Sequence, residues 1–340
     1  MFGFGSMLKD YLISKKITQT DFAQKLGITQ KHMNNILNEN ADISEELMIA
    51  ISLITDIDIK LIAFVEAKKK LYNYLNSHYK NEKEINEFLD SFYLKEMEKL
   101  NWITLNDKTS YLQKAYDLLK YLNVRDFDIY YKYAKEKIFF KKYSDSNLKK
   151  IYLWITRCDS LIYKQKVNDY SKENLNCLLK ELKKERTKTF NKEKLVKLFN
   201  KYGIYLVIER ALDGTKLRGC TRVIDNNPAI YMTYYLKEKS SFYFALYHEL
   251  GHVKSDYNKA KSKVIIDGDD NLEKKADNFA LEHMINSNLY KSILQNYNDR
   301  KKICEDNNVP LCFLYSRLAY DKKILYNDID YLENREKIEY

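Results

Sequence analysis

The chain has 340 residues with a formal net charge of +10, and it is long enough for two or three domains with a sizeable core. No apolar run is long enough to cross a membrane, and the first residues lack the basic start, apolar core and cleavage site of a secretory signal. The five cysteines are scattered without a C-x-x-C pair, which excludes a disulfide framework and a cysteine zinc site, so we expect a soluble cytoplasmic protein.

Residues 19–38 have the spacing of a helix-turn-helix. The small Ala23 stands where two helices cross, and Gly27 supplies the turn between them. Thr29 can cap the second helix, which leaves polar side chains on the outward side of that helix. Four of these side chains are predicted to reach base edges in the major groove: Gln30, Lys31, Asn34 and Asn35. Gln19, at the start of the preceding helix, is predicted to lie near the phosphates.

Charge in this region supports two interpretations. Residues 1–60 carry six Lys and Arg against eight Asp and Glu, which favours a helical pair that docks protein or only dimerises. Residues 15–31, however, carry four Lys against one Asp. We therefore predict a DNA-binding domain over residues 7–65 and keep protein docking as the alternative.

The middle of the chain is predicted to be helical throughout. Residues 28–202 contain neither Gly nor Pro, so they are expected to form helices joined by polar turns, and residues 66–190 to form a packed helical region of unknown role. The basic charge is concentrated here, with 27 Lys and Arg against 18 Asp and Glu over residues 61–190. A solvated lysine-rich face is the ordinary explanation, and a surface for nucleic acid or an acidic partner is the alternative.

Residues 191–340 are predicted to form an α+β domain. Glycine and proline crowd into its first part, and three apolar segments between the resulting turns are typical of short strands. The strands are predicted over residues 204–209, 217–224 and 229–233. They are expected to offer an edge on which an extended substrate pairs.

The segment His248-Glu249-Leu250-Gly251-His252 is an H-E-x-x-H run. Residues four apart lie on one face of a helix, so two imidazoles can bind one Zn²⁺, with Glu249 beside the open coordination position. The preceding residues contain no helix breaker. The alternative is a helix that carries two histidines by chance.

A second helical run, beginning at Glu273, argues against chance. Glu273 can supply the third protein ligand, and Asp277, one turn further on, is placed to accept the free N–H of a ligating histidine. His283 on the same run is expected to be a solvated or packing residue, because catalytic zinc keeps its fourth position open. Glu249 is then the general base, and the group that stabilises the oxyanion is left open between Arg222 and several tyrosines.

These motifs resemble two known families. The helix-turn-helix is similar to the Xre type, and residues 38–47 resemble the turn and next helix of HigA-type antitoxin domains. The second half resembles the ImmA/IrrE family of metallopeptidases in four stretches, residues 203–208, 219–222, 244–252 and 273–280. The resemblance implies that His248, His252 and Glu273 are zinc ligands and Glu249 the catalytic base. Members of that family cleave transcriptional repressors, or are fused to an Xre domain as stress, phage or toxin–antitoxin regulators.

Together the sequence predicts a mainly α chain with a smaller α+β part: a helix-turn-helix bundle, a central all-helical region, and a gluzincin-like peptidase domain with a three-stranded sheet. The predicted function is a DNA-binding regulator with a zinc endopeptidase that cleaves a repressor or antitoxin. Two alternatives remain, an Xre-type repressor or antitoxin whose peptidase-like domain is a sensor or dimerisation module, and a peptidase whose helix-turn-helix docks protein. DNA and a protein substrate are the expected partners, no membrane is expected, and a homodimer is left open.

Overall fold

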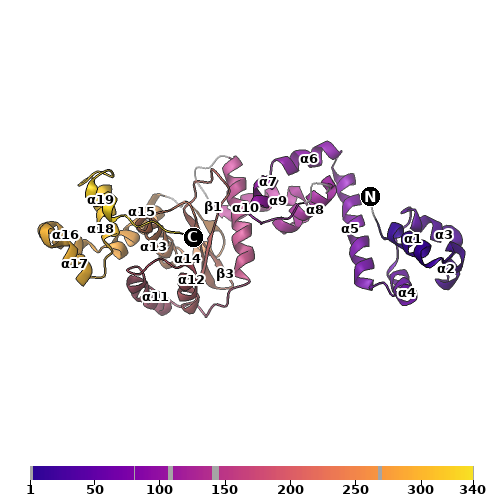
Figure 1. Cartoon of the computed structure of the whole chain (residues 1–340), viewed down its shortest axis with the longest axis horizontal. Helices are drawn as coiled ribbons and strands as arrows, with labels where there is room; N and C mark the ends of the chain where they lie inside the picture. Colours follow the sequence, from indigo (N-terminus) through magenta and orange to yellow (C-terminus); the bar gives the residue numbers. More distant parts are fainter. Residues whose placement is uncertain (1–2, 80, 106–109, 140–144, 267–269, 340) are drawn as a thin grey trace. The chain divides into compact units, whose positions relative to one another are not determined.

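The structure is a computed structural model that describes residues 3–79, 81–105, 110–139, 145–266 and 270–339. These residues are mainly helical, with one small mixed sheet (Figure 1). The chain divides into two compact units, the first made of residues 1–93 and 104–120 and the second of residues 94–103 and 121–340. No described helix is both long enough and apolar enough to span a membrane.

The first unit contains the predicted helix-turn-helix. Its helices are α1 (Phe4–Lys15), α2 (Gln19–Lys25), α3 (Gln30–Leu37), α4 (Glu45–Thr55), α5 (Ile59–His78), α6 (Glu82–Asp90) and most of α8 (Tyr111–Leu122). The Thr18 and Thr29 hydroxyls cap α2 and α3, and Thr29 accepts a hydrogen bond from the backbone N–H of His32 at 3.2 Å. Gly27 takes the left-handed conformation that the tight turn needs, with φ of 69°. The predicted helix pair and its cap are confirmed.

The second unit contains the sheet and the remaining helices. The helices are α7 (Leu94–Lys99), α9 (Phe127–Lys137), α10 (Asp145–Ile162), α11 (Lys172–Glu185), α12 (Lys192–Lys201), α13 (Lys239–Ser255), α14 (Tyr257–Ala260), α15 (Asp270–Met284), α16 (Ser287–Gln295), the 3₁₀ turn η1 (Tyr297–Asp299), α17 (Arg300–Asp306), α18 (Leu311–Tyr320) and α19 (Ile329–Asn334). The strands are β1 (Ile138–Phe139), β2 (Tyr205–Glu209), β3 (Gly219–Ile224), β4 (Asn227–Thr233) and β5 (Val264–Ile265).

The sheet has the strand order β1-β5-β3-β4-β2. The strands β2, β3 and β4 are the three that the sequence predicts, with β2 parallel and β3 antiparallel to the central β4. The predicted number of strands was too low, because the sheet also contains the short strands β1 and β5. The prediction of an all-helical middle was also wrong at one place, since β1 lies within residues 66–190. A strand of two residues is too short to show an alternating pattern in the sequence.

The two faces of β3 are covered by different helices. Successive side chains of a strand point to opposite faces, so Thr221 and its neighbour Arg222 face apart. Thr221 donates a hydrogen bond to Glu249 of α13 at 2.7 Å, whereas Arg222 pairs with Asp159 of α10. On that second face the Tyr231 hydroxyl of β4 also donates to Asp159, at 2.5 Å. The helix α10 therefore belongs structurally to the sheet unit, although it lies in the predicted middle region.

The helices α13 and α15 approach each other closely at one glycine. A Cβ built on Gly251 would lie 3.0 Å from the Cα of Ala276 and 3.3 Å from its Cβ. Two small residues thus allow the backbones of α13 and α15 to pack in direct contact. This approach brings Glu273, one turn before Ala276, opposite the two histidines of α13.

Candidate metal centre

Three side chains from α13 and α15 meet at one point. The Nε2 atoms of His248 and His252 lie 3.1 Å apart, and they lie 3.2 Å and 3.4 Å from the two carboxylate oxygens of Glu273. With zinc–ligand bonds of about 2.0–2.1 Å, tetrahedral ligand atoms are separated by roughly 3.3 Å. The three donors therefore fit a zinc ion, and they form the one cluster of this kind among the residues that the structure describes.

Carboxylates on the far side of each imidazole fix its orientation. The Nδ1 atom of His248 lies 2.9 Å from Asp277, as the sequence predicts, and the Nδ1 atom of His252 lies 2.9 Å from Asp256. When each Nδ1–H donates to a carboxylate, each Nε2 presents its lone pair to the metal position. Asp256 was missed in the sequence, although its position four residues after His252 on the same helical face was a usable signal.

The charges around the imidazoles favour a cation. Burial lowers the pKa of His248, but its hydrogen bonds to Asp277 and Glu273 outweigh burial and raise the pKa to about 10. Burial likewise lowers the pKa of His252, and the hydrogen bond to Glu273 and the nearby Glu249 carboxylate outweigh it and raise the pKa. The surrounding carboxylates thus stabilise positive charge at this point, which either protons or a metal ion can supply.

Glu249 is buried beside the three donors and does not join them. Its side chain is 4% exposed, accepts the hydrogen bond from Thr221, and has a pKa raised by burial. A Cβ on Gly219 would lie 3.0 Å from the Oε1 atom of Glu249, so a larger residue there would press on this carboxylate. Sequence reasoning missed Thr221, because its contact joins a strand and a helix far apart in the chain.

A cavity of about 330 Å³ opens onto the centre and is lined by His248, Glu249 and Glu273 together with Lys216 and Arg218. Arg218 is exposed, and no described carboxylate pairs with it. Arg222, one of the groups that the sequence left open for stabilising the oxyanion, does not line this cavity.

The guanidinium of Arg222 lies on the opposite face of the sheet. It donates to both oxygens of Asp159, at 2.9 Å and 2.7 Å, and so it is not available to the cavity. His283 is also accounted for outside the centre, since its ring stacks on Phe279 with 3.9 Å between centroids and its Nδ1 contacts the Phe279 carbonyl at 2.8 Å. The expectation that His283 is a solvated or packing residue is consistent with these contacts.

We expect the purified chain to hold one zinc ion per molecule. The variant His252→Ala should lose the ion because one of three donors is removed, and Asp256→Asn should weaken zinc binding about 10- to 100-fold because the imidazole loses its orienting carboxylate. Elemental analysis after purification without chelators, and competition with a zinc-sensitive dye, measure both effects. His283→Ala is the matched control and should keep the metal. Full zinc content in His252→Ala would contradict this ligand assignment.

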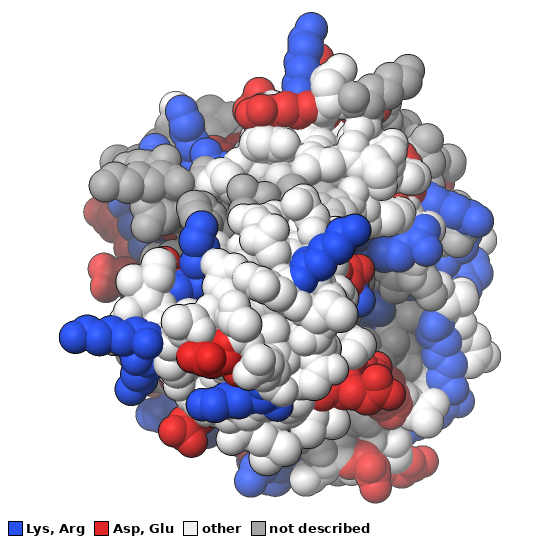
Figure 2. Space-filling model, turned by 90° about the vertical axis from the view of Figure 1, so that its right-hand side faces the viewer, with Lys and Arg blue, Asp and Glu red and all other residues white. Residues whose placement is uncertain are grey.

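The candidate DNA contacts belong to α2 and α3 of the first unit. Gln30, Lys31 and Asn34 are exposed along α3, while Asn35 and Gln19 are half-buried. Figure 2 views the side on which α2 and α3 lie in Figure 1, and its Lys and Arg residues are interspersed with Asp and Glu around a largely uncharged surface. Lys31 is the one basic side chain among the candidate contacts, and Lys15, Lys16 and Lys25 are also exposed nearby in the sequence, so they could meet phosphates.

Comparison with known proteins identifies one part of the chain. A family model described as helix-turn-helix matches residues 8–62, which include α2 and α3. This match supports a DNA-binding regulator. No curated protein and no solved structure matches the chain significantly.

Proposed function

We propose that this chain is an Xre-type DNA-binding transcriptional regulator whose second unit is a zinc-dependent endopeptidase. The observation that carries the proposal is the His248, His252 and Glu273 cluster, whose donor separations of 3.1 to 3.4 Å suit a tetrahedral ion. The buried Glu249 beside it and the resemblance to the ImmA/IrrE family support peptide hydrolysis as its chemistry. The helix-turn-helix match supports the regulator half.

Different residues at the centre have different roles in hydrolysis. When bound, zinc supplies a Lewis acid that polarises a carbonyl and makes water more acidic. Glu249 directly follows His248 and so is turned roughly 100° around α13, which places its carboxylate beside the donors. It accepts the proton of the attacking water and returns it to the leaving amine. Thr221 holds the carboxylate in place during both transfers.

Burial gives Glu249 a suitable basicity. A buried carboxyl with a raised pKa holds a proton more readily near neutral pH than an exposed glutamate does, and a pKa closer to the working pH improves a general acid–base group. Arg218, at the rim of the same cavity, is placed to donate to a substrate carbonyl.

We propose a repressor or antitoxin as the protein substrate, in a stress, phage or toxin–antitoxin setting. A regulator that binds DNA and cleaves a second regulator can relieve repression irreversibly. The test is incubation of the purified chain with the repressor or antitoxin encoded next to its gene. Cleavage at a defined bond that stops on zinc chelation and returns on zinc addition supports the proposal. A zinc-loaded chain that leaves these proteins intact favours the sensor or dimerisation alternative.

DNA recognition is tested separately. Replacing Gln30, Lys31 and Asn35 by alanine should weaken binding to the operator at least about tenfold, because base contacts are worth about 1–3 kcal/mol each. Footprinting upstream of the chain's own gene and gel-shift titration provide the measurement. Asn73→Ala, at an exposed position of α5, is the control. Absence of a protected site, or an unchanged site in the triple variant, would favour protein docking.

A further inference from the structure

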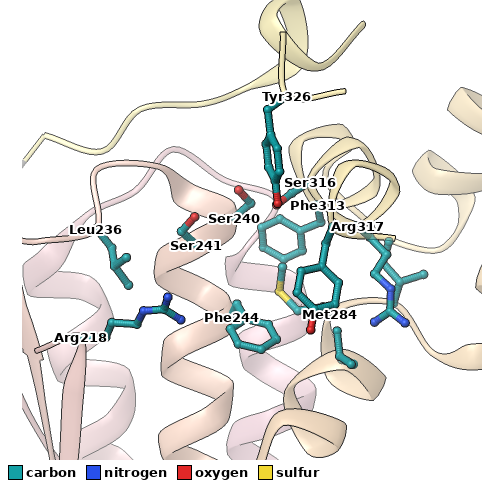
Figure 3. Close-up of a pocket in the computed structure, with 13 residues that line it drawn as sticks. Arg218, Leu236, Ser240, Ser241, Phe244, Met284, Phe313, Ser316, Arg317 and Tyr326 are labelled. Carbon is teal, nitrogen blue, oxygen red and sulfur yellow. The ribbon is translucent and has the colours of Figure 1, made fainter. Parts of the chain in front are cut away.

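A second, mainly apolar pocket of about 230 Å³ lies next to the candidate metal centre in the second unit. Side chains from α13, α15 and α18 surround it (Figure 3). Its apolar lining consists of Leu236, Phe244, Leu281, Met284, Ile285 and Phe313. A pocket of this composition gains free energy by removing an apolar group from water.

The apolar pocket adjoins the cavity at the metal centre. Arg218 and Phe244 line both spaces. Phe244 also precedes His248 by four residues, so the two lie on one face of α13, one turn apart. A peptide whose backbone passes His248 and Glu249 can therefore place a neighbouring side chain in the apolar pocket.

The charges at the pocket disfavour a basic occupant, and its apolar lining disfavours any charged one. Arg317 is held by Asp321 at 2.9 Å and lies over the Tyr290 ring, so its charge is already compensated. Arg218 is exposed at the junction of the two spaces and repels a basic group there. An acidic side chain would lose its hydration to the apolar lining, which is costly without a buried partner.

Backbone hydrogen bonds hold one part of the pocket wall. The chain end pairs with the segment before α13, with the Ile338 N–H donating to the Lys237 carbonyl at 2.8 Å and the Lys239 N–H to the Glu336 carbonyl at 2.8 Å. Tyr326, which precedes this pairing, lines the pocket beside Ser316 (Figure 3). These backbone bonds hold the short segment between Leu236 and Ser240, two residues that line the pocket.

We infer that this pocket binds a large apolar side chain, such as Leu, Met or Phe, next to the scissile bond of the protein substrate. The inference rests on the proposed peptidase function and names its substrate class: segments with a large apolar residue beside the cleaved bond. It assigns Phe244, Met284 and Phe313 to substrate selection and not to the chemical step.

The test uses short acetylated Gly-Ser peptides with one central variable residue, Leu, Phe, Ala, Asp or Lys. Their affinities for the full-length Glu249→Gln protein, measured by fluorescence anisotropy, separate binding from cleavage. Leu and Phe peptides are expected to bind at least about tenfold more tightly than Ala, Asp or Lys peptides, as expected for filling an apolar pocket.

Two variants fill the pocket from different helices, Ser241→Phe on α13 and Ser316→Leu on α18, at positions that are only half-buried. Both should erase the preference for Leu and Phe. Ser255→Phe, at the exposed end of α13, is the matched control and should retain it. Unchanged zinc content and circular dichroism identify the variants that remain folded.

The outcomes for the pocket and for the peptidase are distinct. Equal affinity for the Leu, Phe and Ala peptides, or a preference that survives both filling variants, overturns the pocket assignment. A preference in binding without cleavage of any peptide by the wild-type protein supports the pocket and contradicts the peptidase. Cleavage with no preference for an apolar residue contradicts the pocket alone.

Discussion

Glu249→Gln is expected to lower the cleavage rate by about 10²- to 10⁴-fold or more while leaving the zinc content unchanged. Glutamine has nearly the same shape and can still meet the Thr221 hydroxyl, but its amide cannot accept the proton of the attacking water. The three metal donors, His248, His252 and Glu273, are untouched. Single-turnover cleavage of the identified substrate and elemental analysis of the same preparation measure the two quantities.

Thr221→Val provides a graded comparison. Valine has a similar volume but lacks the hydroxyl that donates to Glu249 at 2.7 Å. This variant should therefore keep the Glu249 carboxylate as the base but lose the hydrogen bond that holds it in position. We expect a smaller loss of rate than in Glu249→Gln. Cleavage by Glu249→Gln at the wild-type rate would show that this carboxylate is not the base, whatever the metal content.

Arg186→Met is expected to destabilise the second unit by roughly 3 kcal/mol, since each unsatisfied buried polar group costs about 1–3 kcal/mol. The Arg186 side chain is 1% exposed and lies between helices. Its guanidinium donates to the carbonyls of His283 and Met284 at the end of α15, and to the Asn308 carbonyl at 3.0 and 3.1 Å. Methionine fills much of the space but leaves these carbonyls without a donor.

Urea denaturation monitored by circular dichroism measures the change. Arg210→Met is the control, because Arg210 is exposed and its ion pair with the exposed Asp213 contributes less than about 1 kcal/mol. An unchanged urea midpoint in Arg186→Met would mean that water replaces the guanidinium at the three carbonyls at little cost. The zinc content of the variant also reports whether the end of α15 must be held for Glu273 to reach the histidines.

Local signals in the sequence were sufficient for the helix-turn-helix and for most of the metal centre. Gly27 forms the turn and Thr29 caps the helix that follows it, so both roles depend only on neighbouring residues in the sequence. His248 and His252 share a helical face by spacing alone. The sequence motif therefore predicts the donors that the structure brings together, including Glu273 from the next long helix.

The remaining contacts of the centre depend on tertiary structure. Thr221 reaches Glu249 only because β3 lies against α13, and no local pattern encodes that packing. The same holds for Gly251, which occupies an unspecified position of the H-E-x-x-H motif yet allows α15 to approach. Arg222, the next residue along β3, shows the same dependence, since its side chain lies on the opposite face of the sheet and pairs there with Asp159.

The ion pair between Arg222 and Asp159 limits where the candidate peptidase can be joined to another domain. The helix α10, which carries Asp159, covers the face of the sheet where Tyr231 is buried and where the Trp154 indole donates to the Glu209 carbonyl at 3.2 Å. A junction at residue 190 would separate α10 from its sheet and expose that face to solvent. Because the second unit also includes α7, α9 and β1, fusion partners for the candidate peptidase can be exchanged only upstream of Leu94, so most of the lysine-rich middle would be inherited with the metal centre.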